Sequence, residues 1–132
     1  MERIMMEGIW KELYDAAVSV IRPYDVSEQM HVGDVGAAVL SKSGKIYTGI
    51  CIDSNCGLGF CAERNAISTM FANGDYDLSK VCAVLEGGKV VAPCGACLEF
   101  IWQMGDGSRD VEILADNDGT VRTLADMLPY AW

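Results

Sequence analysis

Two short segments carry the residues best suited to chemistry, Cys61-Ala62-Glu63 and Pro93-Cys94-Gly95-Ala96-Cys97. Three protein ligands leave the fourth position of tetrahedral zinc open for water, which is the pattern of a catalytic rather than a structural site. Bound zinc makes water nucleophilic near neutral pH, and a carboxylate two residues after one ligand can shuttle its protons. We therefore predict that Cys61, Cys94 and Cys97 bind one Zn²⁺ per chain and that Glu63 is the catalytic acid–base residue.

The expected helices explain how the three thiols meet. Pro93 suits the first turn of a helix, so Cys94 and Cys97 are expected on one helical face, where free N–H groups and the helix dipole favour thiolates. We expect Cys61 to begin a second helix in the same way. Three thiolates and one Zn²⁺ leave one net negative charge, and Arg64 either offsets this charge or is an ordinary surface arginine.

Helices and strands are expected to alternate along the chain. Apolar residues at helical spacing predict a helix over residues 9–21, whereas residues 24–34 are polar and predict an irregular segment. The other expected elements are a hairpin of strands 35–40 and 45–52, a helix from 61 ended by Asn73-Gly74, a strand at 81–85, a helix at 94–104, strands at 111–115 and 120–122, and a last helix capped by Thr123 and Asp126. This alternation indicates a sheet covered by helices, an α/β layered domain.

Length and composition limit the class of protein. The 132 residues fit one domain, 1–132, with 51% hydrophobic and 22% charged residues and no apolar run long enough to span a membrane. Residues 1–6 lack the apolar region of a signal peptide, which predicts a cytoplasmic protein. The net charge of −9, with scattered Lys and Arg, disfavours long nucleic acid and favours a small neutral or cationic substrate.

The six cysteines also allow other interpretations. A disulfide framework needs an oxidising compartment, and Cys82 lies in an apolar run typical of a buried strand. A redox C-x-x-C does not call for Cys61-Ala62-Glu63 upstream, and a four-cysteine structural zinc site lacks its second C-x-x-C. Incidental buried thiols are the remaining alternative. The order of a Cys ligand, Glu two residues later and then P-C-x-x-C is the pattern of zinc nucleobase deaminases.

Over almost its full length the chain resembles the cytidine deaminase family. Cys61-Ala62-Glu63-Arg64 and Pro93-Cys94-Gly95-Ala96-Cys97 match the family's zinc motifs residue for residue. Val35-Gly36-Ala37-Ala38 is similar to the family's first-strand V-G-A-A, and residues 44–49 are similar to its hairpin. Leu128-Pro129-Tyr130-Ala131-Trp132 is similar to its C-terminal L-P-x-A-F.

The resemblance implies a three-layer α/β/α sandwich with a five-stranded mixed sheet, assembled as a homotetramer, or alternatively a dimer, with active sites near subunit contacts. It also implies a hydrolase of a cyclic amidine, in which zinc-bound hydroxide attacks C4 of a cytosine ring, Glu63 shuttles protons and ammonia is released. Backbone near Ala62 would orient the exocyclic amine. Trp132 would pack at the site, unless it is a frayed end residue.

The segment expected to read the substrate departs from the family's pattern. Typical nucleoside deaminases read the sugar with an N-x-E segment, which is Cys51-Ile52-Asp53 here. Asp53 can still accept a hydroxyl hydrogen bond, whereas Cys51 is a poor donor and acceptor. Gly33-Asp34 replaces the aromatic residue that commonly precedes V-G-A-A, and Leu98 replaces the usual arginine. These departures resemble the blasticidin S deaminase branch.

Several functional hypotheses follow from these residues. The leading one is deamination of a free cytosine nucleoside or analogue, and the alternative substrate is an aminoacylnucleoside antibiotic such as blasticidin S, which suits an acidic protein. The net charge and the lack of stacking aromatics with arginines argue against an editor of polynucleotides. A non-catalytic, zinc-stabilised binding module is the hypothesis of another class, and the intact Glu63 argues against it. His31, the single histidine, is either a surface residue or a substrate contact.

Overall fold

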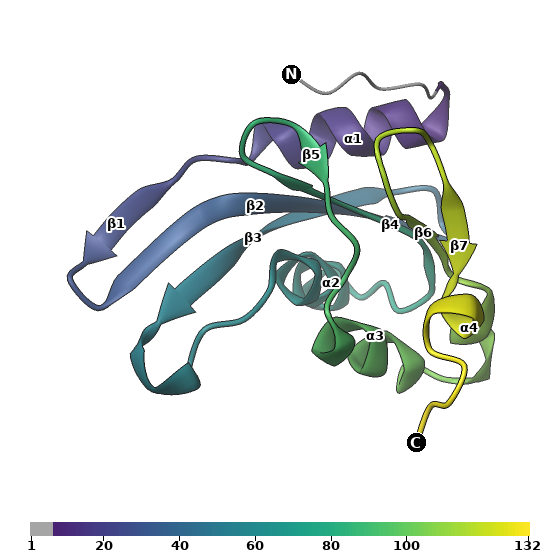
Figure 1. Ribbon diagram of the computed structural model, residues 1–132. Helices are drawn as coiled ribbons and strands as arrows, with labels where there is room; N and C mark the ends of the chain where they lie inside the picture. Colours follow the sequence, from purple (N-terminus) through teal and green to yellow (C-terminus); the bar gives the residue numbers. More distant parts are fainter. Residues whose placement is uncertain (1–6) are drawn as a thin grey trace.

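The computed structural model describes residues 7–132, in which helices cover both faces of one mixed β-sheet (Figure 1). Helix α1 (Ile9–Ser19) lies on one face, and helices α2 (Ala62–Ala72) and α3 (Gly95–Trp102) lie on the other, with the short α4 (Leu124–Met127) beside α3. This is the predicted three-layer α/β/α class. The prediction about a signal peptide in residues 1–6 lies outside the described residues.

Five rows of strands make up the sheet, in the order β3-β2-β4-β6-β7. These strands are β2 (Met30–Ser41), β3 (Ile46–Ser54), β4 (Leu78–Leu85), β6 (Glu112–Leu114) and β7 (Val121–Thr123). Neighbouring rows are antiparallel except β4 and β6, which are parallel. Sequential strands joined by hairpins pair antiparallel, whereas the parallel pair needs the crossover that α3 provides.

Two further short strands, β1 (Tyr24–Ser27) and β5 (Lys89–Val90), raise the strand count from the predicted five to seven. β1 pairs with residues 30–32 of β2, and β4 pairs with residues 35–41 of the same strand. β5 likewise pairs with residues 84–85 of β4, beyond the residues that pair with β6. β1 therefore prolongs the row of β4, and β5 prolongs the row of β6. The fold class is unchanged.

The prediction of an irregular segment over residues 24–34 is wrong. These residues form β1, a turn and the first part of β2, which pairs with β3 from Met30 opposite Ser54 onward. All four residues of β1 are exposed. Tyr24 and Val26 alternate with Asp25 and Ser27, but this pattern spans only four residues, the shortest run that can indicate a strand, and both apolar side chains are exposed.

The core consists of two layers of side chains, one on each face of the sheet. Ala37 and Val39 of β2 point towards α2, and Ala38 between them points towards α1, because successive side chains of a strand alternate between faces. Cys82 is buried in the α1 layer, as predicted, and burial raises the pKa of its thiol to about 12.

The remaining elements agree with the sequence-based prediction to within a few residues. Gly74 has a φ of 74° just after the C-cap of α2, which is the left-handed conformation that glycine accepts most readily. Thr123 and Asp126 form the predicted capping box of α4, with side chain to backbone distances of 3.2 and 3.3 Å. Within residues 7–132, no helix has the length and apolar character needed to cross a membrane.

Candidate metal centre and substrate cavity

The three predicted metal ligands meet where two helices begin. Cys61 is the N-cap of α2, Cys94 is the N-cap of α3, and Cys97 lies in the first turn of α3. Their sulfur atoms all lie within 4.8 Å of one another, and the Cys61 and Cys94 sulfurs are 3.4 Å apart. Tetrahedral zinc with Zn–S bonds of ~2.3 Å holds its sulfur ligands about 3.8 Å apart. The cluster is therefore able to bind a metal of this kind.

The electrostatics of the cluster also fit a divalent cation. Burial raises the pKa of Cys94, but hydrogen bonds from the backbone N–H groups of Cys97 and Ala96 and from nearby thiols outweigh burial, so the net shift is downward. Burial raises the pKa of Cys61 and of Cys97, and negative charge nearby raises both further. Three thiolates this close repel one another, and a bound cation removes that repulsion.

Arg64 approaches the cluster from α2. Its Nη2 atom lies 3.9 Å from the Cys61 sulfur, and its Nε atom is buried without a hydrogen-bond partner among the described residues. This contact favours the interpretation that Arg64 offsets the negative charge of the cluster over the alternative of an ordinary surface residue.

Glu63 is a buried acid in the same place. It lies in the first turn of α2, its exposed fraction is 4%, and it lines the cavity that also contains Cys61 and Cys94. Burial raises the pKa of its carboxyl group, which stabilises the protonated form. A carboxyl group whose protonated form is stabilised in this way can both accept and donate a proton, which suits it to acid–base catalysis.

Two contacts fix α2, and with it Glu63, against strand β3. The Asn65 side chain accepts a hydrogen bond from the Ile50 backbone N–H at 2.8 Å. Gly49 faces the backbone of α2 so closely that a Cβ atom there would lie 2.3 Å from the Ala66 nitrogen. The helix therefore lies directly on the strand, at a distance that only glycine permits.

The cavity beside the cluster has a volume of about 590 Å³, a size typical of small-molecule sites. The lining residues come from the hairpin β2–β3, the loop after it, the start of α2 and the segment before α3: Asp34, Val35, Cys51, Ile52, Asp53, Ser54, Gly57, Gly59, Phe60, Cys61, Ala62, Glu63, Leu85, Val91, Ala92 and Cys94. The same cavity is thus lined by the predicted substrate-binding residues Cys51, Asp53 and Ala62, by Glu63, and by two of the three predicted metal ligands, Cys61 and Cys94.

The two residues predicted to read the substrate differ in their contacts. Cys51 is buried, and its sulfur accepts a hydrogen bond from the Val35 backbone N–H at 3.3 Å. Asp53 is exposed, and its carboxylate makes no hydrogen bond or ion pair with any residue in 7–132. Asp53 is therefore the member of the pair that is open to a substrate.

Among the lining residues that the sequence did not identify as site residues, Asp34 and Phe60 offer a charge and an aromatic ring. The available signal for Asp34 is its place in the segment that departs from the family's aromatic residue. Phe60 follows two glycines in the loop after β3, and its ring is 36% exposed at the cavity. An aromatic ring at the edge of a cavity is suited to stacking on a planar base.

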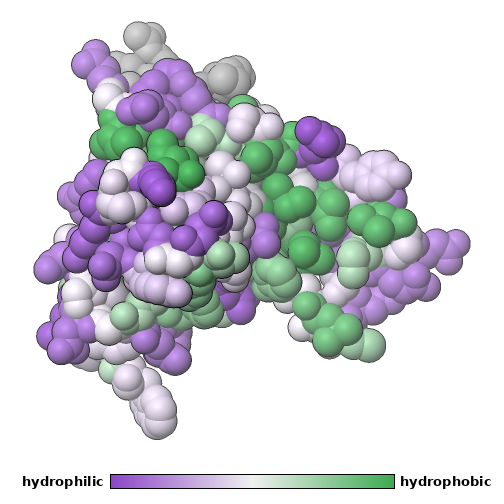
Figure 2. Space-filling view, turned by 180° about the vertical axis from the view of Figure 1, so that it is seen from behind, coloured by the Kyte–Doolittle hydropathy of each residue, from purple (hydrophilic) through white to green (hydrophobic). Residues whose placement is uncertain are grey.

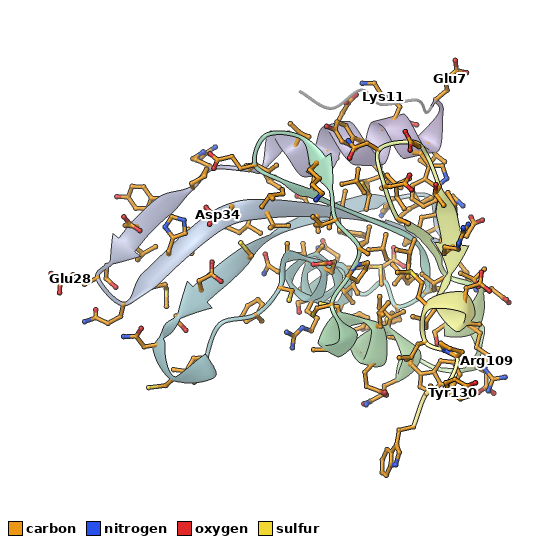
Figure 3. All side chains as sticks on the ribbon, in the orientation of Figure 1. Glu7, Lys11, Glu28, Asp34, Arg109 and Tyr130 are labelled. Carbon is orange, nitrogen blue, oxygen red and sulfur yellow. The ribbon has the colours of Figure 1, made fainter. Side chains whose placement is uncertain are left out.

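Neither Trp132 nor His31 lines the cavity, although His31 contacts the lining residue Asp34 at 2.7 Å. Trp132 is fully exposed and borders a separate depression with Trp102 and Arg109. Figure 3 shows Arg109 and Tyr130 at the end of the molecule opposite Asp34. The structure of one chain does not bring Trp132 to the cavity, so its role there stays a prediction that involves a neighbouring chain.

The three thiols could hold a metal ion, and a buried acid and an open cavity lie beside them; zinc bound there would supply activation of water for attack on a substrate. Centres of this kind belong to hydrolytic metalloenzymes. Comparison with known proteins gives the family: the model of the cytidine and deoxycytidylate deaminase zinc-binding region matches residues 11–113. The chain belongs to this family, and it is a zinc-dependent hydrolytic deaminase.

Individual relatives agree with this assignment. A cytidine deaminase of Halalkalibacterium halodurans is 32% identical over 101 residues, which cover 74% of this chain and 76% of that protein. A blasticidin-S deaminase of Bacillus cereus is 30% identical over 132 residues, which cover 92% of this chain and 90% of that protein. The crystal structure of a Mycobacterium tuberculosis cytidine deaminase superposes with a TM-score of 0.78 at 29% identity, covering 96% of this chain and 98% of that one.

Proposed function

We propose that this protein hydrolytically deaminates a free cytosine nucleoside or cytosine-nucleoside analogue and releases ammonia. The observation that carries the proposal is the buried Glu63 carboxyl group in one cavity with the thiols of Cys61 and Cys94. The cavity volume of about 590 Å³ suits a small molecule rather than a polymer. Relatives named as cytidine deaminases support a cytosine substrate.

In this proposal each site residue has one role. Cys61, Cys94 and Cys97 hold one Zn²⁺, which when bound supplies Lewis-acid activation of water. Glu63 accepts a proton from the attacking water, delivers it to the ring nitrogen and then helps to protonate the leaving ammonia. Backbone at Ala62 orients the exocyclic amine.

The residues further from the metal ligands would bind the rest of the substrate. Asp53 accepts a hydrogen bond from a hydroxyl group, and Cys51 packs against the sugar or its substitute. We also propose that Trp132 contributes to the cavity of a neighbouring chain, because it does not reach the cavity of its own.

An aminoacylnucleoside antibiotic such as blasticidin S is the second candidate substrate. The blasticidin-S deaminase of Bacillus cereus aligns with 92% of this chain, against 74% for the cytidine deaminase of Halalkalibacterium halodurans. The segment Cys51-Ile52-Asp53 also lacks the asparagine with which typical nucleoside deaminases read a sugar.

The test is ammonia release from cytidine, deoxycytidine, cytosine and blasticidin S by wild type and Glu63→Gln. Removing the acid–base group should lower kcat about 10²- to 10⁴-fold with unchanged zinc content, whereas the exposed control Glu12→Gln should match wild type. Zinc-loaded wild type that is inactive on all four compounds would refute the substrate class. Ligand binding without turnover, equal in wild type and Glu63→Gln, would instead favour a binding module.

The protein is further proposed to form a homo-oligomer, with a tetramer favoured over a dimer. Figure 2 shows hydrophobic residues gathered on the face of the projecting end of the sheet. Tyr24 and Val26 of β1 are 63% and 56% exposed there, and Tyr24 borders a depression with Val32 and Ile50. A contiguous apolar surface of this kind is typical of an interface. Light scattering should show that Val26→Asp shifts the population to smaller species, and an unchanged mass would contradict this interface.

The remaining proposals concern the environment of the protein. Residues 1–132 are proposed to act as one domain in the cytoplasm, where a reducing compartment preserves the three thiols that the metal needs. No polynucleotide or membrane partner is proposed, because the net charge is −9 and phosphate binding requires clustered cations. A gel-shift assay with single-stranded DNA and RNA tests this, and retardation at physiological salt would contradict it.

A further inference from the structure

The charged residues that line the cavity are all acidic. Among the described residues around it, Asp34, Asp53 and Glu63 carry carboxyl groups, and no lysine, arginine or histidine is present. Glu63 lies beside the metal ligands, whereas Asp34 and Asp53 belong to the hairpin β2–β3 that projects past α2 (Figure 1). The part of a substrate that extends away from the metal ligands therefore meets two carboxylates on the hairpin.

Asp34 is held in place by a histidine bridge between strands. Its Oδ1 atom lies 2.7 Å from Nε2 of His31, and Nδ1 of the same ring lies 2.6 Å from Oδ1 of Asp25 on β1. The two carboxylates raise the pKa of His31 to about 9, so the ring is positively charged at neutral pH. His31 thus fixes the direction of Asp34 and offsets part of its charge.

Asp53 has no such compensation. It lies opposite His31 in the pairing of β2 with β3, but its carboxylate makes no hydrogen bond or ion pair within the part of the chain that is described. Asp25, Asp34 and Asp53 together carry three negative charges. The imidazolium of His31 carries one positive charge, so two negative charges remain in excess. Charged groups that converge on one cavity attract a ligand of opposite sign.

We propose that Asp53, assisted by the His31-oriented Asp34, binds a positively charged group on the substrate, distant from the cytosine ring. This inference rests on the proposed deaminase function and narrows its substrate class to cytosine nucleosides that carry an ammonium or guanidinium group on the sugar or its substitute. Asp53 is the stronger partner because it is uncompensated, and Asp34 is the weaker one. Both are specificity-determining residues, since neither reaches the ring carbon that reacts.

The test compares cytidine with 5′-amino-5′-deoxycytidine and 3′-amino-3′-deoxycytidine, in which an ammonium replaces one hydroxyl. Wild type should show a higher kcat/KM for at least one amino compound than for cytidine, and added salt should reduce this preference. Asp53→Asn should lower kcat/KM for that compound roughly tenfold, mainly through KM, and should lower kcat/KM for cytidine by a smaller factor, because a hydrogen bond to a neutral hydroxyl is weaker than one to an ammonium group. Asp34→Asn should have the same effect to a smaller extent.

The control is Asp118→Asn, an exposed aspartate in the turn before β7, which should leave both substrates unaffected. Equal losses on cytidine and on the amino compounds would indicate a structural role for Asp53 and overturn the inference. Wild type that turns over cytidine without preferring either amino compound would overturn the inference and leave the deaminase function standing. Wild type that is inactive on every cytosine compound tested would overturn both.

Discussion

Replacing Gly49 by alanine should displace helix α2 and slow deamination without touching a residue of the cavity. The new Cβ atom would lie 2.3 Å from the Ala66 nitrogen and 2.8 Å from its Cα atom, distances that non-bonded atoms do not adopt. Relieving the clash requires strand and helix to separate by about 1 Å, because packed atoms do not compress. The first turn of α2 carries Glu63, so this movement is passed to the catalytic acid.

The size of the effect follows from that displacement. A misplacement of ~1 Å costs on the order of 10²-fold in rate, and overpacking a well-packed contact costs ~1–3 kcal/mol of the free energy of unfolding. Gly107→Ala is the matched control, since its Cβ would meet only the Lys42 amine at 3.6 Å. The assays are kcat/KM for ammonia release, urea unfolding and zinc content. A folded, zinc-loaded Gly49→Ala enzyme with wild-type kcat/KM would refute the reasoning.

Two further predictions concern the metal ligands and the histidine bridge. Cys97→Ser should lower bound zinc well below one per chain and lower the melting temperature, because a hydroxyl is a poor replacement for a thiolate. The control is Cys56→Ser, which changes an exposed cysteine. Full zinc occupancy in Cys97→Ser would contradict the ligand set. His31 has a folded-state pKa of about 9 against an ordinary value of 6.5, so its contribution to stability is complete below pH 6.5 and is lost as the pH rises through 9. The difference in the free energy of unfolding between wild type and His31→Gln, measured with urea, should shrink from pH 6 to pH 9.5, and a pH-independent difference would be evidence against the bridge.

The metal centre could be predicted from sequence because its geometry is local. Cys94 and Cys97 are brought to one face by a single helical turn, and Cys61 with Glu63 lies at the start of another helix. The sequence alone thus specified which side chains share each helix end. Only the meeting of the two helix ends required the sheet on which both helices lie, and the order of the two motifs supplied that information.

The group of acidic residues around His31, at the cavity, could not be predicted in the same way. Asp25, His31, Asp34 and Asp53 come from three strands, and their proximity depends on the register of β1 with β2 and of β2 with β3. The first of these strands has only four residues, all exposed, so burial of one face does not specify its register. The charge that we expect to select the substrate is therefore a product of strand pairing.

The position of Cys61 and Cys94 at two helix starts also has a consequence for folding. The two residues are 33 positions apart in the chain, and β4, which pairs with β2, lies between them in sequence. If the closed metal site constrains the unfolded chain as a cross-link does, a loop of this length corresponds to about 3–4 kcal/mol of chain entropy. The metal would then stabilise the fold mainly by restricting the unfolded chain, in addition to its bonds in the folded one.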